Sequence, residues 1–513
     1  MNHALSGLAA NPALPSGLVD RLIAVSDTDL AHDLADREDL SHAQAVALLR
    51  HAPECGVPLA HAGKLTAADV DPVTQPATAL ALLDEGAGSP EWARLLAADP
   101  VARRREKLAA CPGLPADVVD RLATDPDPAV VAELALWTTP ETAARLAAHP
   151  HAEVRRAVAC NEATPPDVLA ALITGEGLPP ARHCLVCDGE ATPFTHGPEC
   201  SRTDCDLGPG ASCDGSHEST VHALRVAALG NPGTPVEAVV RYADHPSTLL
   251  RWTLAAREDL PPQVCARLAA DPVPGVRADL AENPATGEDV LRVLARDPDI
   301  AVRRGLARHP RVPLDVLTEL ARTAKVGAAL LPRVAAATPA EIEDLARSPD
   351  PAARVLAAQR RDLPPATRDA LASDPDAKVV KAVAPHPGLT EGQLRAMADR
   401  HGRQVLARVA ANPGATPGLL EHLTRQAPPV QKALREIAGH SNATARALSA
   451  CLTDDRARRV AAAHPALPPK VIVELLSDPD RQVVEAAAAN PSLPSTEMAR
   501  LVTGLDGSRT NAG

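Results

Sequence analysis

Aromatic residues are almost absent from this chain of 513 residues, which contains 3 tryptophans, 1 tyrosine and 1 phenylalanine. A large globular core normally uses aromatic side chains to fill its volume. Short helices that pack through Ala, Leu and Val do not need them. The scarcity of aromatics therefore argues against one large globular core and favours an array of small packed helices.

The chain also lacks an excess of positive charge and any long apolar run. Its formal net charge is −13, so a general basic surface for nucleic-acid phosphates is not expected. No apolar run reaches the roughly 18 residues of a membrane span, and the first residues lack the basic-then-apolar order of a secretory signal. We therefore expect a cytoplasmic protein without membrane insertion. Its thiols should stay reduced, which favours a metal site over a disulfide framework.

Glycine is scarce relative to proline, with 29 glycines against 51 prolines. The prolines recur at fixed offsets between apolar segments, so they punctuate helices instead of marking disorder. The sequence contains no phosphate-binding loop, dinucleotide-binding fingerprint or nucleophile elbow. Because the repeats carry no catalytic motif, only the cysteine-rich insert described below could build a catalytic site. We therefore expect a non-enzymatic protein.

An Asn-Pro or His-Pro pair recurs along the chain and sets the phase of a repeat. The interval is roughly 26 residues or a multiple of it, and about eighteen units fit when degenerate copies are included. The pairs begin at Asn11, Asn231, Asn283, His309, His386, Asn412, His464 and Asn490. Because Asn and His alternate in one position, we interpret both as caps of a turn and not as ligands.

One clear unit shows how the repeat folds. A helical segment over residues 302–309 ends at Pro310, since proline cannot continue the helical hydrogen-bond ladder. Pro313 stands where a second helix begins, and the apolar stripe of that helix includes Leu317 and Leu320. Neither helix buries its stripe alone, so stacked neighbours must form the core. The sequence predicts an all-α solenoid of two-helix repeats.

The pattern VR-R-x-L-A-x-(N/H)-P-x-x-P-x-x-V-L-x-x-L-A-x-D-P-D resembles the leucine-rich repeat variant family. The resemblance covers nearly the whole chain outside the insert, and helical repeats of the HEAT type share its general plan. It implies a right-handed superhelix in which α-helices alternate with 3₁₀-helices. The repeat here is longer than the family's.

The predicted organisation has four parts. They are an N-terminal repeat array (residues 1–175), a cysteine-rich metal-binding insert (176–221), a C-terminal repeat array (222–504) and a disordered tail (505–513). The insert adds about 45 residues, rich in Gly, Pro, Asp and Ser and without a periodic apolar pattern. Such a segment cannot bury enough apolar surface to order itself by a core.

Half of the chain's 10 cysteines lie in the insert. Two residues between the first two cysteines let both thiolates reach one tetrahedral metal, as in a zinc knuckle. The predicted ligands are Cys184, Cys187, Cys200 and Cys205, with Cys213 and His217 as additional candidates. We expect structural Zn²⁺. A 4Fe–4S cluster is the alternative. The resemblance to the leucine-rich repeat variant family suggests it, because a member of that family is associated with a four-cysteine cluster beside its repeats. A disordered loop with free thiols is the third interpretation.

A basic residue often follows the first apolar position of the first helix, and stacking would align these side chains in a column. The members of this arginine ladder are Arg155, Arg225, Arg251, Arg277 and Arg303. Two interpretations of the column stay open: each arginine pairs with the carboxylates of an Asp-Pro-Asp turn, or the column binds an acidic protein segment or a phosphate backbone. The lack of interleaved aromatics to stack bases disfavours nucleic acid.

These features together predict a scaffold that binds a protein or peptide partner and carries a structural metal site. The two alternatives are an iron–sulfur redox protein with a repeat docking arm, and a nucleic-acid binder that uses the arginine ladder.

Overall fold

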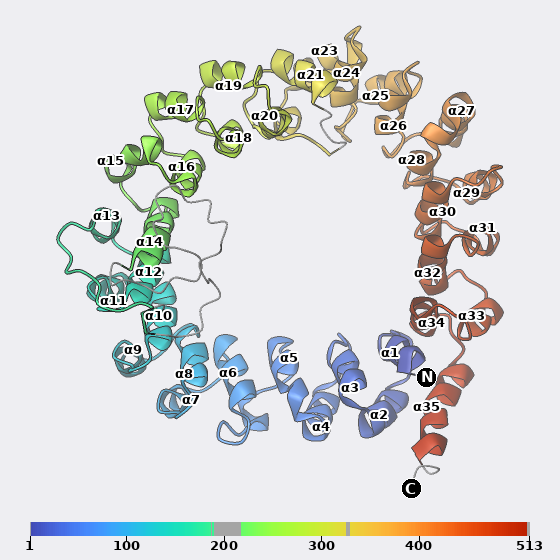
Figure 1. The fold of residues 1–513 in the computed structure, drawn as a ribbon. Coiled ribbons are helices and arrows are strands. Elements are labelled where there is room, and N and C mark those ends of the chain that lie inside the picture. The colour runs from blue at the N-terminus through green and yellow to red at the C-terminus, as the bar shows by residue number, and fades with distance from the viewer. Residues whose placement is uncertain (1, 186, 189–216, 325–328, 510–513) are drawn as a thin grey trace. The chain divides into compact units, whose positions relative to one another are not determined.

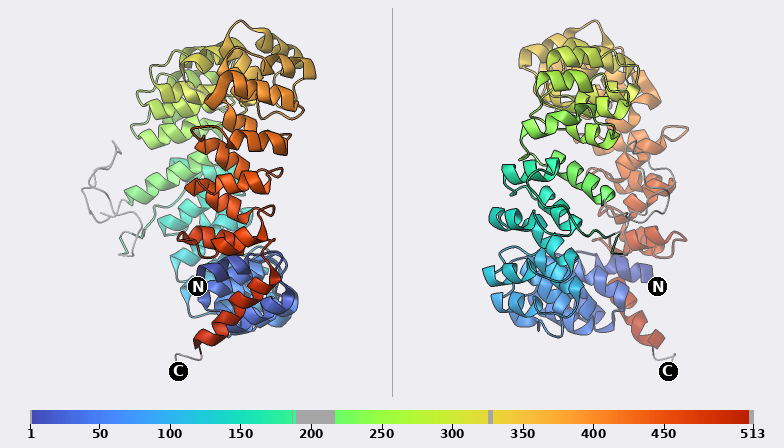
Figure 2. Two further views of the ribbon diagram at one scale, coloured as in Figure 1. Left: turned by 90° about the vertical axis from the view of Figure 1, so that its right-hand side faces the viewer. Right: turned by 60° about the vertical axis from the view of Figure 1, so that its left-hand side comes forward.

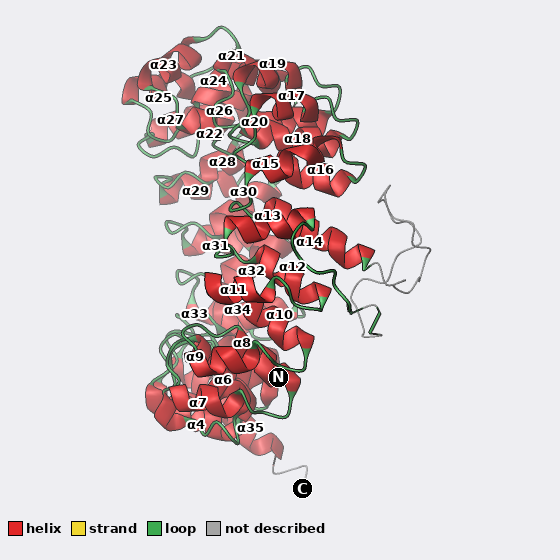
Figure 3. Ribbon diagram, turned by 90° about the vertical axis from the view of Figure 1, so that its left-hand side faces the viewer, coloured by secondary structure: helices red, strands yellow, loops and turns green. Residues whose placement is uncertain are grey.

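The structure, a computed structural model, describes residues 2–185, 187–188, 217–324 and 329–509. Within these ranges the regular elements are helices joined by short turns (Figure 3). The predicted all-α helical-repeat solenoid is confirmed. No helix in the described ranges is long and apolar enough to cross a membrane.

The chain forms two compact units. The terminal unit comprises residues 1–69, 328–330 and 337–513, and the central unit comprises residues 70–327 and 331–336. The boundaries between the two units fall near residue 70 and near residues 327–337, within the repeat arrays and not at the insert. In a stacked array each repeat contacts only its neighbours, so the core is continuous past the insert.

In the central unit, the first helix of each repeat packs on the first helix of the next (Figure 1). These first helices are α6 (Pro76–Asp84), α8 (Ala102–Ala109), α10 (Pro128–Trp137), α12 (Ala152–Cys160), α14 (Glu218–Gly230), α16 (Thr248–Ala255), α18 (Pro274–Glu282) and α20 (Ile300–Arg308). The second helices are α7 (Pro90–Leu96), α9 (Ala116–Leu122), α11 (Pro140–Leu146), α13 (Pro166–Thr174), α15 (Val236–Val239) continued by η3 (Val240–Asp244), α17 (Pro262–Leu268), α19 (Glu288–Leu294) and α21 (Leu314–Thr323). Helix α22 (Pro332–Ala335) also belongs to this unit.

The terminal unit has the same two-helix repeats. Its first helices are α1 (Asn2–Ala9), α3 (Thr28–Ala35), α5 (Gly56–His61), α24 (Pro351–Ala357), α26 (Ala377–Val383), α28 (Leu406–Ala410), α30 (Gln431–Ala438), α32 (Asp455–Ala463) and α34 (Arg481–Ala488). Its second helices are α2 (Ser16–Val25), α4 (His42–His51), α23 (Pro339–Arg347), α25 (Pro365–Ala372), α27 (Glu391–His401), α29 (Pro417–Thr424), α31 (Ala445–Cys451), α33 (Pro469–Leu475) and α35 (Ser495–Arg509). Three short 3₁₀ segments, η1 (Pro53–Cys55), η2 (Ala67–Asp69) and η4 (Gly402–Gln404), complete it.

The second helices are α-helical except where η3 continues α15. This differs from the regular α/3₁₀ alternation that the family resemblance implies. The described residues contain four 3₁₀ segments, each of 3 to 5 residues. The roughly 26-residue repeat leaves about seven residues for the second helix, as in α17. That length permits i to i−4 hydrogen bonds, whereas 3₁₀ runs beyond three or four residues are uncommon.

The Asn and His anchors join successive repeats. Asn283 donates hydrogen bonds from Nδ2 to the carbonyl oxygens of Ala255 and Arg257, at 2.7 and 2.6 Å. Its Oδ1 accepts from the backbone N–H two residues later. His309 reproduces this geometry: Nε2 lies 2.9 Å from the carbonyl oxygen of Asn283, and Nδ1 accepts from the N–H two residues later. The anchors therefore cap their own turn, as predicted, and also bind the preceding repeat.

The ladder of anchors continues across the insert. Nδ2 of Asn231 donates to the carbonyl oxygens of Ala159 and Asn161, each at 3.0 Å, although Asn161 lies 70 residues earlier. Helices α12 and α14 accordingly pack directly on each other. The insert interrupts the sequence but not the stack.

Within the terminal unit, the first repeat stacks on the last. Nδ2 of Asn11 donates to the carbonyl oxygens of Ala488 and Asn490, both at 2.8 Å, and α1 packs on α34 (Figure 1). At Gly7 a Cβ atom would clash with the carbonyl oxygen of Glu485, so the two helices approach closely. The repeat of Asn11 thus occupies the place of a successor to the repeat of Asn490.

The C-terminal helix lies against this joint. Helix α35 contacts α1 and α2, as Figure 2 shows beside the N-terminus, and its Met498 and Val502 are buried. The helix continues to Arg509. The sequence assigns residues 505–513 to a disordered tail, and this assignment stays a prediction. Residues 510–513 lie outside the described ranges.

Candidate metal centre

The first residues of the insert are fixed to the start of α12. The backbone N–H groups of Arg182 and His183 donate to the carbonyl oxygen of Pro150, at 2.8 and 3.2 Å. The N–H of Ala152 donates in return to the carbonyl oxygen of His183, at 2.9 Å. This parallel bridge places the residues that follow it at the joint between α12 and α14.

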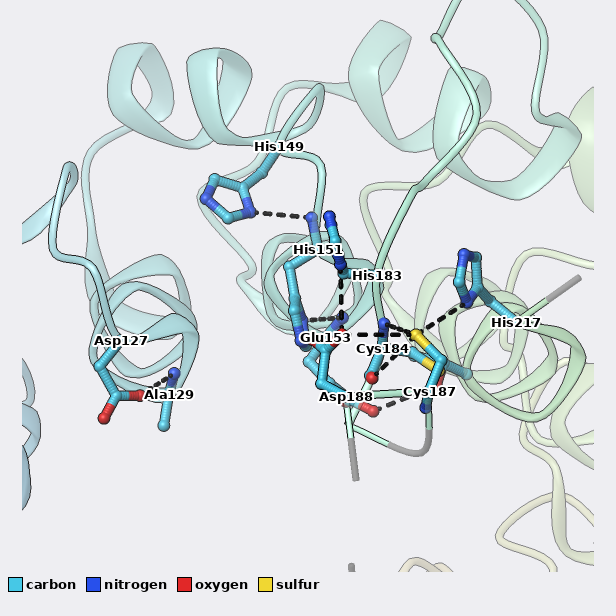
Figure 4. Close-up of polar contacts among 11 residues, drawn as sticks. Asp127, Ala129, His149, His151, Glu153, His183, Cys184, Cys187, Asp188 and His217 are labelled. Carbon is cyan, nitrogen blue, oxygen red and sulfur yellow. Dashed lines mark hydrogen bonds and ion pairs between the residues drawn. The ribbon is translucent and has the colours of Figure 1, made fainter. Parts of the chain in front are cut away.

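Cys184, Cys187 and His217 converge at that joint (Figure 4). One ligand atom from each residue lies within 4.8 Å of the other two, and Sγ of Cys187 is 3.9 Å from Nδ1 of His217. Cys184 and His217 are buried, whereas Cys187 is exposed. Two thiolates and one imidazole at such separations are three of the four ligands that a tetrahedral metal requires.

Backbone N–H groups of the Cys184–Cys187 loop point toward its sulfur atoms. The N–H of Cys184 donates to Sγ of Cys187 at 3.0 Å, and the N–H of Cys187 donates to Sγ of Cys184 at 3.5 Å. Sγ of Cys187 in turn donates to the carbonyl oxygen of Cys184 and to Oδ1 of Asp188, at 3.3 and 3.6 Å. These contacts hold the two cysteines in one tight loop.

Asp188 links the loop to two neighbouring imidazoles. Its Oδ1 lies 3.2 Å from Nδ1 of His183 and its Oδ2 lies 3.3 Å from Nε2 of the buried His151. Burial raises the pKa of Asp188, but hydrogen bonds from His183 and Cys187 and the nearby imidazoles bring the pKa below its usual value. The sequence does not predict this cluster, since His151 belongs to a repeat turn and only folding brings it beside the insert.

His217 holds a strained backbone conformation. Its φ of 55° is the only positive φ of a non-glycine residue in the described ranges. The left-handed region costs an L-residue about 1 kcal/mol or more. His217 directly precedes α14, so the stacking of α14 on α12 holds it in place.

The structure therefore brings together three of the predicted ligands, including His217 from the additional candidates. Cys200, Cys205 and Cys213 lie outside the described residues, so their part in the site stays a prediction. The signal in the sequence for His217 was its residue type within the insert, because a histidine can replace a cysteine as a zinc ligand.

Two members of the arginine ladder form ion pairs with the Asp-Pro-Asp position of the next repeat. Nε of Arg251 lies 2.6 Å from Asp271, and Nε of Arg277 lies 2.7 Å from Asp297. Burial raises the pKa of Asp297, but its hydrogen bond with Arg277 and other contacts lower the pKa below its usual value. Both arginines also donate to the backbone of the turn before their own helix. These guanidinium groups connect neighbouring repeats. Of the two predicted roles, pairing with the Asp-Pro-Asp turns and binding a ligand, they fill the first.

The other three ladder residues differ from one another. Arg155 and Arg303 donate to backbone carbonyl oxygens of nearby turns. Arg225 is half-buried and forms no hydrogen bond or ion pair with another described residue. The reason is that His245 occupies the position after Arg225 that Asp271 occupies after Arg251. The protein's own acceptors thus engage four of the five ladder residues, and a basic track along them stays a prediction.

Cysteines elsewhere have no metal-binding geometry among the described residues. Cys55, Cys111 and Cys451 are buried. Burial raises the pKa of Cys111 and of Cys451 to about 12, and that of Cys55 to about 11. Such thiols stay protonated and act as small apolar side chains.

No family model matches the chain, and no curated protein matches it significantly. Among solved structures, the crystal structure of an engineered protein, a target of the Northeast Structural Genomics Consortium, is 17% identical. That match covers 92% of this chain and 98% of the engineered chain, with a TM-score of 0.12. A TM-score of this size supports no argument about fold or function, so the description of the chain as a helical-repeat protein rests on its own helices and joints.

Proposed function

We propose that the chain is a non-enzymatic helical-repeat scaffold that binds a protein or peptide partner, and that its insert holds a structural zinc ion. The observation that carries the proposal is the convergence of Cys184, Cys187 and His217 at the joint of α12 and α14. Stacked helical repeats offer an extended binding surface. The resemblance to the leucine-rich repeat variant family belongs to the same proposal.

The presence of His217 favours zinc over iron and sulfur. Structural zinc accepts thiolate and imidazole ligands together, whereas 4Fe–4S clusters are held by four cysteine thiolates. We assign the fourth ligand to Cys200 or Cys205 on their spacing in the sequence. The thiolates at 184 and 187 and the imidazole at 217 come from opposite ends of the insert, so one ion would pin both ends to the same joint.

Elemental analysis of the full-length protein, purified from its native host without chelators, tests the metal. We expect about one zinc per chain, and loss of that zinc in the variant C184S/C187S. The control variant C160S changes an exposed cysteine outside the cluster and should keep its zinc. Iron in place of zinc, with a broad absorption band near about 400 nm that bleaches on reduction, would refute the zinc assignment.

Affinity capture from the native host tests the scaffold. The full chain should retain specific proteins, and comparison with C184S/C187S shows whether the metal centre contributes to their binding. A chain that loads zinc and retains no protein above the level of an unrelated bait would refute the scaffold proposal.

A further inference from the structure

The first helices α26, α30 and α32 carry exposed basic residues at matching positions of their repeats. Each has two basic residues three positions apart, which places both on one face of the helix. We call the resulting surface the basic face; its residues are Lys378, Lys381, Lys432, Arg435, Arg456 and Arg459. The chain as a whole has a net charge of −13, so this concentration of cations is local.

The repeat arranges these residues in two parallel columns. Helices α26, α28, α30 and α32 pack on one another in order within the terminal unit (Figure 1). The anchors His386, His440 and His464 follow the three charged helices and occupy the same place in each repeat. Equivalent positions of stacked repeats lie side by side, so the first members of the three pairs form one column and the second members form the other.

Most of the basic face is free of internal partners. Four of its side chains are exposed and form no ion pair with another described residue: Lys378, Lys381, Lys432 and Arg456. Arg435 and Arg459 each reach an aspartate of the following turn, at 3.5 and 3.0 Å, and stay 32% and 46% exposed. The basic face thus differs from the arginine ladder, in which the side chains are buried or half-buried and most are saturated by the protein's own acceptors.

The repeat pattern itself does not demand these cations. The corresponding positions of α16 in the central unit hold Leu249 and Trp252, both exposed, and those of α18 hold Gly275 and Ala278. The stack therefore tolerates apolar and small residues at the same places. Packing does not explain the six basic residues, and their exposure leaves them available to a ligand.

We propose that the basic face binds an extended acidic segment of a partner protein. The inference rests on the proposed scaffold function and names the surface and the chemistry of its ligand. Packed helices lie about 10 Å apart, so α26 to α32 cover about 30 Å, the length of about nine residues of extended chain. Alternate carboxylates of such a segment would face the two columns.

Charge and composition favour an acidic polypeptide over a nucleic acid. No aromatic residue follows Trp252 in the sequence, so the basic face has no ring on which a base could stack. The surrounding negative charge of the protein would also repel a long polyanion more than a short acidic segment. Single surface ion pairs are weak, so affinity must come from several pairs at once and must fall as salt rises.

Fluorescence anisotropy with a labelled peptide of about twelve residues, rich in Glu and Asp, tests the inference on the full chain. We expect binding at about 50 mM salt, and at least about tenfold weaker binding to the variant K378E/K432E/R456E. The matched control R347E/R425E/R446E reverses three exposed arginines of the second-helix side, with the same change of net charge. It should change affinity less than about threefold.

Equal weakening in the variant and the control would overturn the inference, as would tighter binding of a duplex DNA than of the peptide. Circular dichroism and thermal unfolding establish that both variants are folded. If the unmodified chain captures partners from its host but does not bind the peptide, the basic-face inference fails and the scaffold proposal stands. If it captures no partner, the scaffold proposal fails as well.

Discussion

Replacing Asn11 by alanine should loosen the contact between the first and last repeats while leaving the other joints closed. The side chain is fully buried and donates two hydrogen bonds of 2.8 Å, to the carbonyl oxygens of Ala488 and Asn490. Its Oδ1 also accepts a hydrogen bond from the N–H of Ala13. Alanine makes none of these bonds and leaves the two carbonyl oxygens without their donor in a site that excludes water.

The expected magnitude follows from those bonds. A neutral hydrogen bond contributes about 1 kcal/mol net, and a buried polar group left unpaired costs about 1–3 kcal/mol. The two lost bonds that cross the joint should therefore lower the free energy of opening α1 from α34 by about 2–4 kcal/mol. Since each 1.4 kcal/mol is about a factor of ten, backbone amides that exchange through this opening should exchange about 30-fold to 1000-fold faster.

Hydrogen–deuterium exchange read by mass spectrometry measures the effect helix by helix. In N11A, peptides from α1 and α34 should lose protection. The matched variant N412A removes the same pair of bonds, of 2.6 and 2.7 Å, at an internal joint. It should affect α26 and α28 but not α1. Unchanged exchange of α1 in N11A would refute the reasoning, because the first repeat would then not depend on the last.

The remaining predictions concern the anchors, the ion pairs and the thiols. Burial lowers the pKa of His309, so its contribution to stability is present above about pH 6.5 and is lost as the pH falls through the folded-state pKa. H309N should flatten this acid decline of the thermal midpoint, and an unchanged slope would contradict it. Arg277→Met, which leaves a buried carboxylate unpaired, should cost roughly 2–3 kcal/mol in urea unfolding. Arg292→Met removes an arginine from an exposed ion pair and should leave the free energy of unfolding unchanged. An equal loss of stability in both variants would contradict the claim that the buried pair stabilises the fold more. Burial raises the pKa of Cys111 to about 12, so mass spectrometry should find it unalkylated in the native chain. A chelator should increase alkylation of Cys187; the same rate with and without chelator would count against a bound metal.

The sequence by itself determined the repeat and its turns. Pro310 and Pro313 act on their own backbone, and the structure ends α20 and begins α21 beside them. The alternation of Asn and His in one position also predicted their common role, because Nδ2 and Nε2 are donors at similar reach while Oδ1 and Nδ1 accept from the same turn. Such properties depend on residues a few positions apart and can be read locally.

Tertiary structure alone decided which groups these side chains meet. The acceptors of Asn283 lie one repeat away, whereas an acceptor of Asn11 lies 479 residues away, although both anchors have the same signature in the sequence. Which helices stack also determines that His217 lies beside Cys184. In the same way, it determines that Arg277 pairs with a carboxylate and does not face solvent. The first and last repeats carry the same Asn donor and carbonyl acceptors that join other neighbouring repeats, as at Asn283 and Asn412. Their mutual stacking therefore uses the same chemistry as those joints, and only the tertiary structure shows that it forms.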